Sequence, residues 1–224
     1  MPEIPLPQIG VPAPGPPAVL RTAVQPGGQS ARESVFQLAV AGLEDGLAQQ
    51  RRDRPELAFE DEPAPRRLAP YAAAVAASVL EGDNEVGWGK FVLLYDPAGQ
   101  AGWAGQFRII AYIRAELDPE IAADTLIAEV GWSWLLEALD ARATGYGQTS
   151  GTVTRVVTEG FGAKQDEPMS TGFELRASWS PAGDGEQPAL DGHVAAWCDA
   201  LCMAAGLPPA GVTALRGADR RPQR

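Results

Sequence analysis

Two apolar segments joined by a strong turn signal narrow the folds that are open to this chain. Residues 89–95 and 106–116 are rich in β-branched, leucine and aromatic side chains, which favour strands. Between them, Asp96-Pro97-Ala98-Gly99 combines a proline, which fixes φ, with a glycine, which accepts a positive φ. The chain therefore reverses here, and the two segments are predicted to form an antiparallel hairpin.

Strand and helix patterns on both sides of this hairpin complete the predicted fold. Residues 71–81 have strand character, although their alanine-rich run also fits a helix, so both alternatives stay open. Further strands are predicted at 152–159 and 172–179, and helices at 31–50, 118–143 and 191–206. The order α-βββ-α-ββ-α is typical of an α+β fold, here a mostly antiparallel five-stranded sheet packed with three helices.

The helix predicted at 118–143 is expected to be buried on more than one side. It begins at Asp118-Pro119, where the aspartate can cap the helix and the proline suits its first position. Its middle is apolar nearly all round, unlike a surface helix with a single apolar stripe. Gly131 lies in this middle and would let another element approach closely.

The two ends and one internal segment have the composition of unstructured chain. Residues 1–29 contain eight prolines and are predicted to be disordered. Residues 51–69 are rich in Arg, Asp, Glu and Pro and are predicted to be a linker. Residues 208–224 are predicted to be a flexible basic tail. Between the two ends, residues 30–207 are predicted to form a single α+β domain that contains the linker.

The chain is poor in the side chains that most enzymes use. It has one histidine, His193, and two cysteines, Cys198 and Cys202. Both cysteines fall on the apolar stripe of the last helix, where they are expected to pack as small hydrophobic side chains. Their C-x₃-C spacing is not the C-x₂-C of a zinc site, and the chain has no second pair of cysteines to complete one. His193 is expected to face solvent. We therefore predict no catalytic residue, no metal and no cofactor.

Several arginines are candidates for a ligand or partner face. On the strand at 106–116, Arg108, Tyr112 and Arg114 share one face, because side chains alternate along a strand. Arg155 and Arg176, on the last two strands, could join that face. The group would make an anion site, since guanidinium groups bind carboxylate or phosphate at two points. The alternative, which we favour, is a solvated face with weak cross-strand ion pairs.

The six tryptophans fall into two groups. Trp132, Trp134, Trp179 and Trp197 lie at positions expected to face the core. Trp88 and Trp103 flank the central hairpin, where they either pack over the sheet or anchor a partner. We favour packing for this pair and keep both as candidate partner residues.

The charge and the absence of apolar runs exclude several partners. The net charge of −11 repels phosphate backbones, so binding of nucleic acid or of an anionic membrane is not expected. No stretch of 18 apolar residues and no signal-peptide pattern is present. Two cysteines in such a chain indicate free thiols and a cytoplasmic protein.

Seven short segments occur in a familiar order. They lie at residues 67–72 (RLAPYA), 93–99 (LLYDPAG), 113–117 (IRAEL), 130–135 (VGWSWL), 151–155 (GTVTR), 176–179 (RASW) and 196–199 (AWCD), the last followed by 205–209 (AGLPP). Together they resemble the actinobacterial family catalogued as domain of unknown function 3000, over roughly residues 32–210. The resemblance implies an actinobacterial cytoplasmic protein and carries no activity.

These patterns leave two functions open. The first is a non-enzymatic protein-interaction or adaptor module that self-associates or binds a protein partner. It rests on the poverty of reactive groups beside plentiful tryptophan. The alternative is a protein that binds, or an enzyme that acts on, a small anionic metabolite through the arginine-bearing sheet face.

Overall fold

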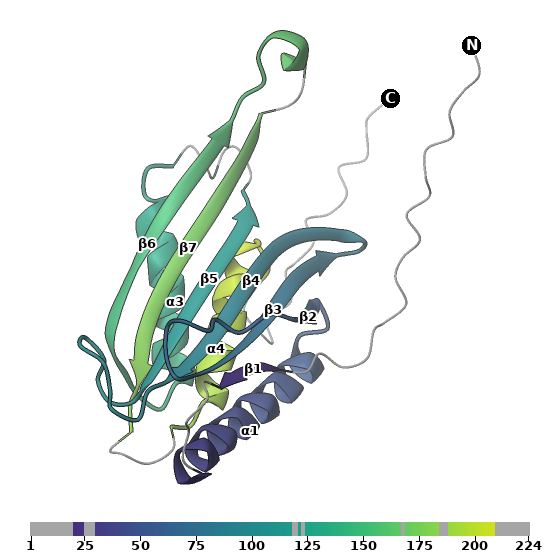
Figure 1. Cartoon of the computed structure of the whole chain (residues 1–224). Coiled ribbons are helices and arrows are strands. Elements are labelled where there is room, and N and C mark those ends of the chain that lie inside the picture. The colour runs from purple at the N-terminus through teal and green to yellow at the C-terminus, as the bar shows by residue number, and fades with distance from the viewer. Residues whose placement is uncertain are drawn as a thin grey trace.

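One antiparallel sheet with helices on one side forms the framework of the protein (Figure 1). The computed structural model describes residues 20–24, 30–117, 121, 124–166, 169–183 and 188–208. The helices lie against one face of the sheet, here called the helix face, and the opposite face is called the outer face. This arrangement confirms the predicted α+β class and corrects the strand count from five to seven.

The strands pair in an order that differs from their order along the chain. They are β1 (Arg21–Val24), β2 (Leu57–Asp61), β3 (Tyr71–Glu81), β4 (Asn84–Tyr95), β5 (Phe107–Glu116), β6 (Tyr146–Thr158) and β7 (Ser170–Pro181). The sheet order is β1-β3-β4-β5-β7-β6, and β2 also pairs with β3. Strand β6 therefore forms one edge, and the short strands β1 and β2 together form the other.

The helices with described bounds are α1 (Ser30–Asp53), α3 (Ile127–Arg142) and α4 (Asp191–Ala204). Helix α4 packs against both α1 and α3 and against β4 and β5. Its side chains from His193 to Cys202 are buried, so it is the centre of the helix layer. The predicted start of the second helix, residues 118–120, lies outside the described residues, and α3 begins at Ile127.

The predicted hairpin and all five predicted strands are present. Tyr95 pairs with Phe107 at the end of the β4–β5 hairpin. In the turn, Gly99 adopts a φ of +70° and donates its N–H to the Asp96 carbonyl at 2.9 Å. Residues 71–81 form a strand, which settles the alternative between strand and helix, because β3 is paired along both of its edges.

The two additional strands lie in segments predicted to be unstructured. The prediction of disorder for residues 1–29 is wrong for Arg21–Val24, which form β1, while residues 1–19 and 25–29 lie outside the described residues. The linker predicted at 51–69 contains the end of α1 and all of β2. Strands of 4 and 5 residues carry too little periodic signal to be recognised, and they exist by pairing with β3.

The alternation of side chains sends the large apolar groups to the helix face. On β7, for example, Phe173, Leu175 and Trp179 are buried in the main core, as the sequence predicts. A smaller cluster lies on the outer face, where Val92 and Leu94 pack with alanines of β3. Trp103, from the β4–β5 loop, packs against this cluster, which agrees with the packing role that we favour for it.

Gly131 allows α3 to approach the sheet, as the sequence suggested. A Cβ atom at this position would overlap the ring of Phe173, because the backbone of the helix already lies against that ring. Helix α3 therefore contacts Phe173 of β7 at a residue without a side chain. The expectation that this helix is buried on more than one side is wrong, because its buried residues form one stripe: Ile127, Gly131, Leu135, Ala138 and Leu139.

We predict that Gly131→Ala destabilises the protein by about 1–3 kcal/mol, because the added methyl group overpacks the core. Alanine is the better helix former, so propensity alone predicts the opposite sign. Gly42→Ala is the matched control in α1, because a Cβ there meets nothing within 4 Å, and it should stabilise by up to about 1 kcal/mol. Urea unfolding of both variants measures the difference, and equal effects would contradict this packing.

Candidate functional site

The outer face of the sheet carries most of the predicted site residues. Arg108, Tyr112 and Arg114 of β5 alternate with core residues and lie on this face, and Tyr112 pairs with Arg176 of β7. Trp88 of β4 pairs with Arg114, so it lies there too. The sequence therefore placed Arg108, Tyr112 and Arg114 on one face correctly, and Arg176 joins them as expected, whereas Arg155 does not.

Arg155 does not join the group. It pairs with Phe173, a core residue, and opposite residues of antiparallel strands share a face. Its Nη1 donates to the backbone carbonyl of Asp124 at 3.1 Å, on the helix face. The prediction that Arg155 shares a face with Arg108 is wrong, because the register between β6 and β7 was not readable from the chain.

Arg114 and Arg176 are paired with carboxylates and with aromatic rings. Arg114 lies 3.3 Å from Glu85 and 5.5 Å from the ring centre of Trp88. Arg176 lies 3.1 Å from Glu174 and 5.6 Å from the ring centre of Tyr112. These side chains are neutralised and exposed, so this part of the face matches the alternative that we favour, a solvated surface with weak ion pairs.

Arg108 has different surroundings. It is only 8% exposed, and its guanidinium donates to the hydroxyl oxygens of Ser178 at 2.7 Å and of Ser150 and Ser180 at 3.3 Å. Within the described ranges, no carboxylate pairs with it. Burial lowers the pKa of Arg108, as expected for a cation without a counter-charge.

A hollow of about 430 Å³ lies over Arg108 on the outer face. Trp103 and Leu68 form part of its wall, and Ser150 and Ser178 are part of its lining. The β-bulge between Gly147 and Ser150 lies beside it and includes Gln148, a non-glycine residue with a φ of +53°. Bulges and unusual backbone conformations gather near functional sites, where they redirect side chains.

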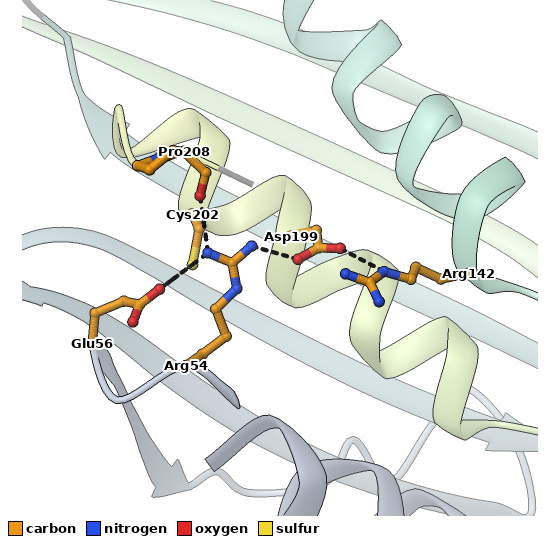
Figure 2. A network of polar contacts seen from close by, with 6 residues as sticks. All are labelled: Arg54, Glu56, Arg142, Asp199, Cys202 and Pro208. Atoms are coloured by element: carbon orange, nitrogen blue, oxygen red, sulfur yellow. Dashed lines mark hydrogen bonds and ion pairs between the residues drawn. The ribbon is translucent and has the colours of Figure 1, made fainter. Parts of the chain in front are cut away.

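A buried polar network joins the helices on the other side of the molecule (Figure 2). Arg54, which follows α1, contacts Asp199 of α4 at 2.5 Å and Glu56 at 3.0 Å. Asp199 also accepts a hydrogen bond from Arg142 of α3 at 2.9 Å. Arg54 donates further to the carbonyl of Pro208 at 3.0 Å. The network connects α1, α3, α4 and the segment after α4, so its role is structural.

This network was not predicted from the sequence, although one signal was available. Asp199 is a charged residue within the otherwise apolar stretch of α4 that includes Cys198 and Leu201. A carboxylate in such a place must find a partner, because burying an unpaired charge is costly. The partner could not be named, since Arg54 lies in a segment with the composition of a linker.

The three most reactive side chains lie in the core rather than in a site. Cys198 and Cys202 are free and buried, as predicted. Burial raises the pKa of Cys202 to about 12 and holds the pKa of Cys198 well above its ordinary value. Neither is therefore a nucleophilic thiolate near neutral pH.

Trp179 and Trp197 are fully buried as predicted, while Trp132 and Trp134 are only partly buried against the core.

The expectation that His193 faces solvent is wrong, because the side chain is fully buried. Its Nδ1 accepts a hydrogen bond from Trp179 Nε1 at 3.1 Å, which leaves the proton of the neutral ring on Nε2. Burial lowers the pKa of His193 to about 4. The ring is thus a neutral core group, because the His193 side chain packs against Trp179 of β7 while Asp191, at the start of α4, is exposed.

Two negative findings concern the part of the chain that the structure describes. It contains no group of three or more His, Cys, Asp or Glu side chains placed to hold a metal ion. None of its helices combines the length and the apolar character needed to cross a membrane.

Comparison with known proteins identifies a family. A protein-family model described as "Protein of unknown function (DUF3000)" matches residues 33–213. No curated protein and no solved structure matches the chain.

We predict that Asp199→Ala lowers the free energy of unfolding by about 3–5 kcal/mol, because it leaves the buried Arg54 guanidinium short of its main partner. Arg114→Ala removes an exposed ion pair and should cost less than about 1 kcal/mol. Chemical unfolding of both variants tests the contrast. Similar small losses would show that the Arg54 network does not hold the helices together.

A second prediction concerns pH. The folded-state pKa of His193 lies below its ordinary 6.5, so its stabilising effect is present above pH 6.5 and is lost as the pH falls toward 4. The loss amounts to about 3 kcal/mol, at 1.36 kcal/mol per pKa unit. His193→Asn keeps a hydrogen-bond acceptor for Trp179 but has no group that titrates in this pH range. The stability difference between native protein and variant should therefore shrink by that amount between pH 7 and pH 4, and a constant difference would refute it.

Proposed function

The chain belongs to the DUF3000 family of proteins of unknown function, and we propose that it is a protein-interaction module that self-associates through the outer edge of β6. The proposal rests above all on the contrast between the two edges of the sheet. One edge is built from the short strands β1 and β2, with 4 and 5 residues. The other is β6 alone, with 13 residues.

Long unpaired strand edges invite pairing with another chain, and short or broken edges resist it. Across the described chain, β6 pairs only with β7, so its other side offers a row of backbone donors and acceptors. Its final stretch, Thr152–Thr158, is rich in β-branched residues and contains no proline or glycine, which favours strand addition. The edge therefore fits β-augmentation, the addition of a strand from a partner.

Exposed apolar side chains gather at the same end of the molecule. The β6–β7 hairpin projects beyond the other strands (Figure 1). Val156 and Val157 on β6, Phe161 in the connection and Met169 before β7 are all exposed, Phe161 by 78%. Apolar groups concentrated in this way are typical of interaction surfaces.

The sequence of β6 favours a second copy of the chain as the partner. Antiparallel pairing of two chains about a twofold axis at Val157 sets Val156–Thr158 of the two β6 strands against each other and places each Val157 opposite its copy. Arg155 then lies opposite Glu159, which directly follows β6, and the pair occurs twice. Opposite charges in such cross-strand positions stabilise pairing, whereas like charges oppose it.

The locations of the reactive groups support a non-enzymatic role. His193, Cys198 and Cys202 are buried in the core, and their pKa shifts keep the histidine neutral and the thiols protonated near pH 7. Two free, buried thiols also support a reducing, cytoplasmic compartment.

We predict that the protein is a dimer at micromolar concentration and that Val157→Lys makes it monomeric, because two lysines then lie opposite each other across the axis. Light scattering after size-exclusion chromatography measures the mass. Leu38→Lys in α1 is the matched control, because Val157 and Leu38 are each 57% exposed. It should leave the dimer intact.

The charged pair gives a second test of the same interface. Glu159→Arg should weaken the dimer more than Glu159→Gln does, because it places two arginines opposite each other and leaves the hydrogen bond from Arg155 to the Asp124 carbonyl in place. A strictly monomeric native protein would refute self-association. A dimer that survives Val157→Lys would place the interface elsewhere.

A further inference from the structure

The surroundings of Arg108 point to a ligand, independently of any association through β6. Buried arginines are normally paired with a carboxylate, because an uncompensated charge away from water is costly. Arg54 in the same protein follows that rule, with Glu56 and Asp199 as partners. Arg108 is nearly as buried, yet its described partners are three neutral hydroxyl groups.

Some of the serine hydroxyl groups around Arg108 carry protons that no described residue accepts. Ser150, Ser178 and Ser180 each accept a hydrogen bond from the guanidinium, so their own protons point elsewhere. One proton lies between Ser150 and Ser178, whose oxygens are 3.2 Å apart. Among the described residues, nothing accepts the other protons. Ser180 is fully buried, also accepts from the Ala104 N–H at 3.1 Å and does not line the hollow. The hollow itself thus holds a positive charge and one spare O–H donor from the Ser150–Ser178 pair, and an anion would satisfy both.

The hollow over Arg108 also has an apolar wall. Leu94 and Ile110 of the sheet, together with Leu68 and Trp103 from the loops, line it beside the polar groups. An indole next to a guanidinium suits a molecule with a flat or aliphatic body and a charged end. Its volume, about 430 Å³, is in the range of small-molecule sites.

We propose that this hollow binds a small organic anion, with its carboxylate or phosphate group on Arg108 and the hydroxyl groups of Ser150 and Ser178, and with its apolar body against Trp103. The other outer-face arginines are not part of the site, since Arg114 and Arg176 already pair with Glu85 and Glu174. On this face, Arg114 and Arg176 are therefore neutralised by carboxylates, whereas no carboxylate of the described residues neutralises Arg108. The bulge at Gln148 accounts for the placement of Ser150 beside Arg108.

Calorimetric titration of the full chain in a phosphate-free buffer tests the proposal. The probes are phenyl phosphate and phenylacetate, which distinguish the two head groups, with benzyl alcohol as the neutral match and inorganic phosphate as the bare anion. At least one aromatic anion should bind more tightly than both controls. Arg108→Met should weaken that binding by about tenfold or more, as expected for a lost charged hydrogen bond. Arg176→Met, on the same face, should leave it unchanged.

The thermal stability of the variant without ligand separates a binding role from a structural one. Replacing an uncompensated buried charge by an apolar side chain of similar length is often neutral or stabilising. Arg108→Met should therefore melt at or above the temperature of the native protein. A lower melting temperature, equal binding by Arg108→Met, or no binding of either aromatic anion would each overturn the proposal. Equal affinity for inorganic phosphate and phenyl phosphate would overturn the role assigned to Trp103.

Discussion

The apolar character of α4 on all sides dictates most of the architecture. This helix has no polar face, so it must be covered by the sheet and by both α1 and α3. Gly89 on β4 allows the close approach, because a Cβ there would lie 3.1 Å from Trp197. Asp199 is the one charged side chain in the buried stretch, and its ion pairs with Arg54 and Arg142 connect the three helices.

Packing all helices on one face leaves the outer face and the sheet edges for other roles. Reactive groups of α4 become core groups, and this explains why a histidine and two thiols so close in sequence form no site. On the outer face, charge pairing divides the arginines: Arg114 and Arg176 have carboxylate partners, whereas Arg108 has serines. The strand order leaves β6 as a long edge, because among the described strands it pairs only with β7.

The fold was largely readable from local patterns, and the site only in part. The alternation on β5 correctly placed Arg108, Tyr112 and Arg114 on one face, because the side-chain period of a strand is independent of its partners. Arg155 was misplaced because its face depends on the register between β6 and β7, which no local pattern shows. Local patterns could not show which arginines had counter-charges, since Glu85 is remote in sequence from Arg114.

Local sequence was enough to specify the main elements: three helices, five strands, the hairpin at Asp96–Gly99 and the small residue at Gly131. Each follows from periodicity, capping or turn chemistry within a few residues. Other features depend on residues that are far apart in the sequence, so only the tertiary structure determines them. Strands β1 and β2 exist only beside β3, and His193 is neutral only because the core excludes water. Arg108 has three serine hydroxyl groups and no carboxylate of the described chain as partners, and this follows from the assembled sheet rather than from local sequence.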